Sequence, residues 1–135
     1  MRKGPEKNFW RWLDKVMANC WSVQRHEDRY SVGIPDLSYG VNNINGWIEL
    51  KAYEQWPVNT IKHFTAKQAA WLTNRGEAGG HCFILIRING TILLFNWKKA
   101  YALLTDIKGE YELCYYAKKV WESTFNKKEF IGLIT

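Results

Sequence analysis

The stretch GIPDLSYGVNNINGWIELK, residues 33–51, decides the fold of this chain. Its alternation predicts two strands, over 36–41 and 47–52, joined by a polar turn over 42–46. Within the turn, Asn45-Gly46 is a dipeptide that favours a tight connection between antiparallel strands. The stretch is therefore expected to form a β-hairpin.

Three charged residues of this hairpin indicate a chemical site. Glu49 and Lys51 are two apart on the second strand, so their side chains share a face, and Asp36 begins the first strand. The hairpin can bring the two carboxylates together, and two close carboxylates need a cation between them. Such hard oxygen ligands suit Mg²⁺ or Mn²⁺, and a lysine beside them can hold an anionic phosphate. For the Glu-x-Lys pair alone, an ordinary solvated strand face is the alternative.

The rest of the chain supplies elements around this hairpin. Expected helices cover 5–19, 66–75 (with Thr65 as N-cap) and 97–104, and expected strands cover 20–25, 82–88 and 91–95. Residues 111–117 fit either strand or helix, and the tail from Lys118 has no assigned structure. The order of elements predicts an α/β fold of the α+β kind, with a central mixed β-sheet flanked by helices.

Bulk properties limit the class of protein. The length suits a single domain over 1–135, in which 97–135 forms a C-terminal elaboration. A formal net charge of +6 favours a polyanionic partner. The three cysteines are widely spaced and lack zinc-site spacing, which indicates free thiols in a reducing compartment. No signal peptide or membrane-spanning stretch is visible, so a cytoplasmic location without a membrane partner is expected.

Together these motifs resemble the PD-(D/E)xK nuclease superfamily, most of all its VRR-NUC-like and Holliday-junction-resolvase-like members. The resemblance extends from about residue 6 to about residue 95. It implies a restriction-endonuclease-like core in which Asp36 and Glu49 bind Mg²⁺, for which Mn²⁺ substitutes. It also implies that Lys51 faces the attacking water or the phosphate, and that the backbone carbonyl of Leu50 is a further metal ligand.

The resemblance implies two more catalytic residues, Gln68 on the helix after the Glu-x-Lys strand and Glu6 on the first helix. A solvated helix residue is the alternative for Gln68, and a carboxylate favoured by the helix dipole is the alternative for Glu6. Basic residues on these elements are candidates for contact with the DNA backbone through charge. They are Lys7, Arg11, Arg25, His26, Arg29, Lys62 and Lys67. An ordinary polar connection is the alternative for those between 25 and 29.

The activity implied by the resemblance is metal-dependent hydrolysis of DNA phosphodiester bonds by an endonuclease without an organic cofactor. The metal polarises the phosphate and lowers the pKa of a bound water, while Lys51 offsets the growing negative charge. The resemblance favours structure-selective cutting of branched DNA, in the manner of a Holliday junction resolvase. One interpretation of it is a phage-encoded protein that acts in the host cytoplasm. A homodimer is expected because two symmetric strands are cut. The alternatives are a VRR-NUC-type nickase or flap nuclease, and a non-catalytic DNA-binding module with the same fold.

Overall fold

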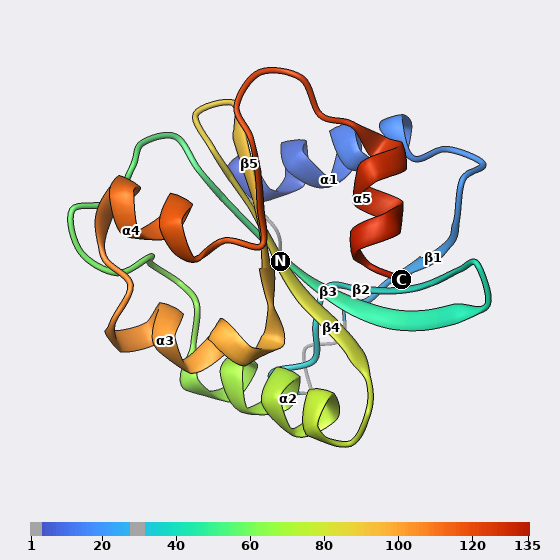
Figure 1. Cartoon of the computed structure of the whole chain (residues 1–135), viewed down its shortest axis with the longest axis horizontal. Coiled ribbons are helices and arrows are strands. Elements are labelled where there is room, and N and C mark those ends of the chain that lie inside the picture. The colour runs from blue at the N-terminus through green and yellow to red at the C-terminus, as the bar shows by residue number, and fades with distance from the viewer. Residues whose placement is uncertain (1–3, 28–31) are drawn as a thin grey trace.

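A single six-stranded sheet, in the order β1-β2-β3-β4-β5-β6, organises the chain (Figure 1). The computed structural model describes residues 4–27 and 32–135. The strands are β1 (Ser22–Arg25), β2 (Leu37–Val41), β3 (Ile44–Tyr53), β4 (His81–Ile88), β5 (Thr91–Asn96) and β6 (Lys119–Trp121). β3 and β4 are parallel, and the other four neighbouring pairs are antiparallel. The predicted mixed sheet is therefore confirmed.

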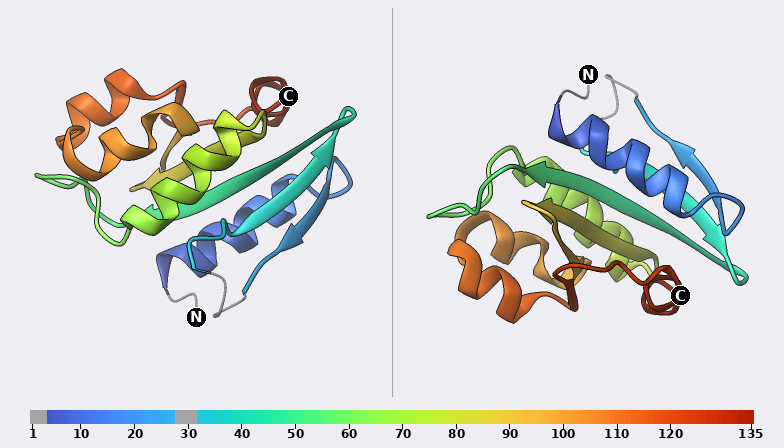
Figure 2. Two further views of the ribbon diagram at one scale, coloured as in Figure 1. Left: turned by 90° about the horizontal axis from the view of Figure 1, so that it is seen from below. Right: turned by 90° about the horizontal axis from the view of Figure 1, so that it is seen from above.

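Helices cover both faces of this sheet, with α1 and α2 on opposite sides (Figure 2). One face carries α1 (Pro5–Val16) and α5 (Lys127–Leu133), and the other carries α2 (Ala66–Glu77), α3 (Ala100–Thr105) and α4 (Gly109–Tyr116). A short 3-10 helix, η1 (Trp97–Lys99), precedes α3. In the described part of the chain, none of the helices has the length and apolar character needed to cross a bilayer.

The core on the α1 side fixes which way the residues of β3 point. Phe9 and Leu13 of α1 are fully buried and pack in one cluster with Ile48 and Leu50 of β3. Full burial of one such side chain contributes about 1.5–3 kcal/mol. Because successive strand residues alternate between faces, Glu49 points to the other side, toward the face that α2 covers.

The core on the α2 side is also tightly packed. Leu72 of α2, Ile84 and Ile86 of β4, and Leu103 of α3 are completely buried in one cluster. The helix predicted to end at residue 75 continues to Glu77. It passes through Gly76, where an added Cβ would lie 2.2 Å from the Trp97 ring, so glycine lets η1 pack closely.

The prediction that Asn45-Gly46 forms the hairpin turn is wrong. The turn is Asn42-Asn43, with φ values of 51° and 64°, and Val41 pairs directly with Ile44. Asparagine tolerates this left-handed conformation better than most residues, so the turn is chemically reasonable. Gly46 lies inside β3, where an added Cβ would lie 2.3 Å from the Tyr39 hydroxyl oxygen, so it serves packing and not turning.

Other boundaries shift by a few residues. The first helix ends at Val16, before residue 19, because Asn19 adopts φ 65° and the Cys20 N–H donates to the Met17 carbonyl. β1 accordingly starts at Ser22, and β2 starts one residue after Asp36. The helix expected over 97–104 is present as η1 and α3.

The C-terminal segment is an integral part of the fold. Residues 111–117, which fitted either strand or helix, mostly belong to α4, and the unassigned tail forms β6 and α5. Phe130 and Ile134 are fully buried in the α1-side core. The Tyr39 hydroxyl donates a 2.7 Å hydrogen bond to the Ile134 carbonyl, which ties the tail to the hairpin.

Candidate active site

The candidate site lies where the ladder between β2 and β3 ends. Its last pair is Leu37 with Ile48, and Pro35 just upstream has no N–H with which to extend it. The same register places Asp36 opposite Glu49. Leu37 and Ile48 belong to the α1-side core, so both acidic side chains belong to the opposite face. Asp36 and Glu49 are thus the next residues of two neighbouring strands, just past the last pair of the ladder.

The Asp36 side chain accepts a backbone hydrogen bond from β3 at a point that the β2 strand does not reach. Its Oδ2 accepts a 2.7 Å hydrogen bond from the Leu50 N–H, which lies beyond the last β2 pair. A buried N–H needs a partner, so this contact explains a carboxylate that is 1% exposed. The N–H and C=O of one strand residue point to the same side, so the Leu50 carbonyl is directed toward Asp36 as well.

Glu49 lies between a cation and an amide. Its Oε2 is 3.3 Å from the Lys51 ammonium and accepts a 3.1 Å hydrogen bond from Nε2 of Gln68. Lys51 also donates a 2.9 Å hydrogen bond to the His63 carbonyl. Glu49 and Lys51 are buried, so the alternative of a solvated strand face is wrong. Mutual pairing offsets the cost of removing both charges from water.

The orientation of Gln68 is set by the start of α2. Its Oε1 accepts from the Thr65 N–H at 3.0 Å, and the Thr65 hydroxyl accepts from the Gln68 N–H at 3.2 Å. This capping box confirms Thr65 as the N-cap. A side-chain amide has one acceptor end and one donor end, so the donor end faces Glu49.

Two backbone positions with positive φ support the site. His63, with φ 66°, presents its carbonyl to Lys51 from a conformation that most residues avoid. Gly33 has φ 86°, and an added Cβ there would lie 2.5 Å from the Lys67 carbonyl oxygen. The loop before Asp36 therefore packs closely on the first turn of α2.

A groove of about 970 Å³ extends beside the site, lined in part by Glu6, Tyr53, Lys62 and His63. The Tyr53 hydroxyl donates to the Lys62 carbonyl. Burial raises the pKa of Tyr53, and the negative charges of Glu6 and Glu49 raise this pKa further. Glu6 and Tyr53 line the same groove, which places Glu6 at the border of the site.

No protein-family model matches the chain, and no curated protein matches its sequence. Among solved structures, the chain is similar to Hjc, a Holliday junction resolvase from the archaeal hyperthermophile Archaeoglobus fulgidus. The TM-score is 0.52 at 16% sequence identity, over 68% of this chain and 77% of that chain. The chain has a resolvase-like fold. This confirms the predicted restriction-endonuclease-like core, and it does not single out the VRR-NUC-like members.

The basic residues for which DNA contacts were predicted lie at separate places in the resolvase-like fold. Lys7 and Arg11 are exposed on α1, across the sheet from α2. Lys62 and Lys67 are exposed on either side of the α2 N-cap. Arg29 lies outside the described residues. Their contacts with DNA stay predictions.

Arg25 and His26 have internal partners in the resolvase-like fold. The Arg25 guanidinium lies over the Trp10 ring at 5.9 Å and pairs with Glu27 at 3.5 Å. The His26 N–H donates to the Asp36 carbonyl at 2.7 Å, and its Nε2 lies 2.8 Å from the Ser38 hydroxyl. Of the two, His26 is the one that borders the carboxylates.

Four residues near the site were missed from the sequence: Trp47, Tyr53, Trp71 and Arg75. A sequence signal existed for all of them. Trp47 and Tyr53 continue the two-residue alternation of Glu49 and Lys51, so they lie on the same face of β3 as that pair. Trp71 and Arg75 follow Gln68 at helical spacing on α2.

The donor set of the candidate site fits a hard divalent ion. Within residues 4–27 and 32–135, no three His, Cys, Asp or Glu side chains are grouped for metal binding. Mg²⁺ does not require such a cage, because it commonly uses one or two carboxylates with water and substrate phosphate. The buried carboxylates of Asp36 and Glu49, with the Leu50 carbonyl directed toward Asp36, meet this requirement.

Proposed function

We propose that this protein is a metal-dependent endonuclease that hydrolyses phosphodiester bonds in DNA. The observation that carries the proposal is the buried Glu49 carboxylate 3.3 Å from the Lys51 ammonium, next to the Asp36 carboxylate that accepts from the Leu50 N–H. This arrangement lies on a fold similar to that of a Holliday junction resolvase.

Asp36, Glu49 and the Leu50 carbonyl would hold Mg²⁺, with Mn²⁺ as a substitute. When bound, such an ion supplies Lewis-acid stabilisation of the phosphate and makes water a better nucleophile near neutral pH. The chain contributes two carboxylates that hydrogen bonds hold in place. Asp36 is held by the Leu50 N–H, and Glu49 is held by Gln68.

Lys51 supplies positive charge beside the reacting phosphate. Its side chain is only 4% exposed, so its field is weakly screened by water. The His63 carbonyl and Glu49 hold the ammonium in place before substrate arrives. A preset charge stabilises developing negative charge without reorganising in the transition state.

Gln68 and Glu6 have supporting roles. Gln68 is a positioning residue, because its amide donates to Oε2 of Glu49 while the helix cap fixes its other end. Glu6 lines the adjoining groove from the first turn of α1 and adds negative charge beside Tyr53. We assign Glu6 to orienting water at the groove side of the site.

The proposed substrate is branched DNA. The net charge of +6 suits a polyanion, and the similar solved structure is that of a Holliday junction resolvase. Symmetric cutting of two strands requires two sites, so the proposed working form is a homodimer. A nickase or flap nuclease and a non-catalytic DNA-binding module are the alternatives that the following experiment decides.

The test uses end-labelled four-way junction, flap and plain duplex DNA, each with Mg²⁺, Mn²⁺ or EDTA. The expected result is metal-dependent cutting with preference for the junction, lost in Asp36→Asn and Glu49→Gln. Asp14→Asn is the matched control, because Asp14 is exposed on α1, across the sheet from α2. Preference for flaps identifies the flap nuclease. DNA binding without any cutting identifies the non-catalytic module.

A further inference from the structure

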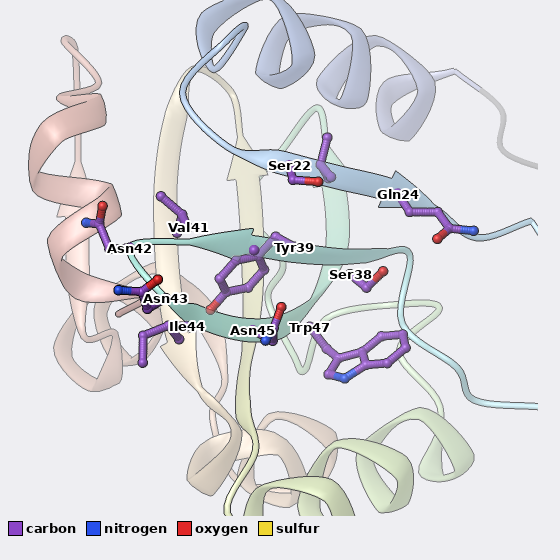
Figure 3. Close-up of a pocket in the computed structure, with 13 residues that line it drawn as sticks. Ser22, Gln24, Ser38, Tyr39, Val41, Asn42, Asn43, Ile44, Asn45 and Trp47 are labelled. Carbon is purple, nitrogen blue, oxygen red and sulfur yellow. The ribbon is translucent and has the colours of Figure 1, made fainter.

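A polar hollow of about 1050 Å³ lies on the hairpin part of the sheet. Figure 3 shows its floor, with Ser22 and Gln24 from β1, Ser38 from β2, and Asn45 and Trp47 from β3. The described residues that line the hollow include no charged side chain. Such a floor offers hydrogen-bonding groups and does not repel a polyanion.

Where this hollow meets α2, it is bordered by two tryptophans and an arginine. The rings of Trp47 and Trp71 contact each other edge to face, with centroids 4.9 Å apart. The Arg75 guanidinium lies over both, 4.5 Å from the Trp71 centroid and 5.3 Å from the Trp47 centroid. Two indoles therefore hold one cation at the edge of the hollow.

Arg75 keeps its hydrogen-bonding capacity in this position. It is exposed, and none of the ion pairs among the described residues involves it. Stacking on an indole uses the flat face of a guanidinium, while its N–H donors lie in the plane and point outward. A planar fork of this kind matches two oxygens of a phosphate.

The arginine is close to the candidate active site. Trp47 precedes Glu49 by two residues on the same face of β3, and Trp71 follows Gln68 by three residues on α2. Roughly one helical turn, about 5 Å along the axis, thus separates Gln68 from the ring that holds the guanidinium.

We propose that Arg75, held by Trp71 and Trp47, binds a backbone phosphate of the strand that is cut. The bound phosphate flanks the scissile phosphate, and the strand continues over the polar hollow beside α2. This inference rests on the proposed nuclease function and adds a specific contact to it. The ligand chemistry is a phosphodiester, recognised by a preset guanidinium and not by charge alone.

The test measures DNA affinity as a function of salt. The Asp36→Asn variant serves as the parent so that the DNA stays intact, and a labelled four-way junction is titrated by fluorescence anisotropy from about 50 to about 200 mM salt. Arg75→Gln is expected to reduce the slope of log Kd against log salt by about 0.9, which corresponds to one lost phosphate contact. Lys128→Gln, an equal charge change on exposed α5, is expected to leave the slope unchanged.

Arg75→Lys separates a guanidinium contact from charge. It is expected to keep the parent slope while Kd rises several-fold, because an ammonium cannot form the planar, stacked fork. Trp71→Leu is expected to raise Kd in the same way. A parent-like slope in Arg75→Gln, or parent-like affinity in Arg75→Lys, would overturn the assignment.

Failure of this inference is distinguishable from failure of the proposed function. If the wild-type chain cuts DNA and Arg75→Gln keeps the parent slope, only the role of Arg75 is wrong. If the wild-type chain neither cuts nor binds DNA, the proposed function is wrong, and the role of Arg75 is wrong with it. Urea denaturation of each variant shows whether a lost contact reflects lost folding.

Discussion

The Lys51 ammonium lies 3.3 Å from Oε2 of Glu49, and the two side chains are only 4% and 1% exposed. A second ion pair, between Lys119 and Glu129, has the same 3.3 Å separation with 37% and 41% exposure. The two pairs therefore differ mainly in solvation. Buried charges interact strongly, whereas exposed pairs are screened. This contrast makes Lys51 and Glu49 the pair to test for a role in cleavage, with Lys119 and Glu129 as a control within the same chain.

Lys51→Ala is expected to slow cleavage by about 10²–10³-fold, the scale for losing one preset electrostatic stabiliser. The reason is that the ammonium beside the reacting phosphate disappears while the carboxylates stay. Single-turnover rates at saturating enzyme measure this effect apart from DNA binding. Lys119→Ala is expected to cut at the wild-type rate. Equal cleavage rates in the two variants would show that Lys51 has no role in the chemical step.

The same pair of variants is expected to differ in stability without metal. Lys51→Ala leaves a buried carboxylate without its cation, so unfolding free energy should fall by about 3–5 kcal/mol. Lys119→Ala removes an exposed pair and should cost no more than about 1 kcal/mol. Urea denaturation in EDTA measures both values. Addition of Mg²⁺ should restore most of the loss in Lys51→Ala, and no recovery would argue against metal at Glu49.

Gln68→Ala and Thr65→Ala separate the helix cap from the site. Each variant removes part of the capping box and should lower the unfolding free energy by about 1 kcal/mol. Only Gln68→Ala also removes the 3.1 Å contact to Glu49. Cleavage should therefore fall in Gln68→Ala and stay near wild type in Thr65→Ala. A parallel fall in both would show that Gln68 acts through folding alone.

Gly33→Ala tests whether the loop before Asp36 must approach α2 closely. Alanine at φ 86° is strained, and its Cβ would meet the Lys67 carbonyl oxygen at 2.5 Å. Gly79→Ala is the matched control, because φ there is 101° and no atom lies within 4 Å of an added Cβ. Both variants should lose about 1–2 kcal/mol from backbone strain. Only Gly33→Ala should also lose cleavage, since Asp36 is displaced.

Much of the site could be predicted because its signals are local. Alternation on a strand predicts that Glu49 and Lys51 share a face, the hairpin brings Asp36 to the neighbouring strand, and the resemblance adds Gln68 from the following helix. The contacts among them then follow from the register of β2 on β3 and from the capping box at Thr65.

The rest depends on information that short windows do not contain. Asn45-Gly46 satisfies the local rule for a turn, but Tyr39 and His81 pack against Gly46 from elsewhere in the fold. The contact from Lys51 to the His63 carbonyl depends on the positive φ of His63, which no sequence pattern predicted. Long-range packing decided these points.

Cys82 gives a prediction for stability at alkaline pH. Burial raises the pKa of its thiol from 9.0 to about 11, although the Arg75 guanidinium opposes the shift. Between these two pKa values the Cys82 thiol stays protonated in the folded state and ionises in the unfolded state. The contribution of this thiol to the free energy of unfolding is therefore complete below about pH 9. It is lost as the pH rises from about 9 toward 11, by at most about 2–3 kcal/mol.

Urea denaturation at about pH 7.5, below this range, and at about pH 10.5, inside it, measures the loss. Cys82→Ala should lose less stability between these two pH values than the wild-type chain. Cys20→Ala, a change at a half-buried thiol, is the control and should behave like wild type. Burial raises the pKa of Tyr39 and Tyr53 as well, and these residues are common to all three proteins. An unchanged pH dependence in Cys82→Ala would contradict the assignment.

The central claim is that Asp36 and Glu49 share a divalent ion. A crystal soaked in manganese chloride, with anomalous diffraction measured near the manganese edge, tests it most directly. The expected result is an anomalous peak about 2 Å from a carboxylate oxygen of each residue and from the Leu50 carbonyl. Manganese bound only elsewhere, with Glu49 still paired to Lys51, would contradict the claim.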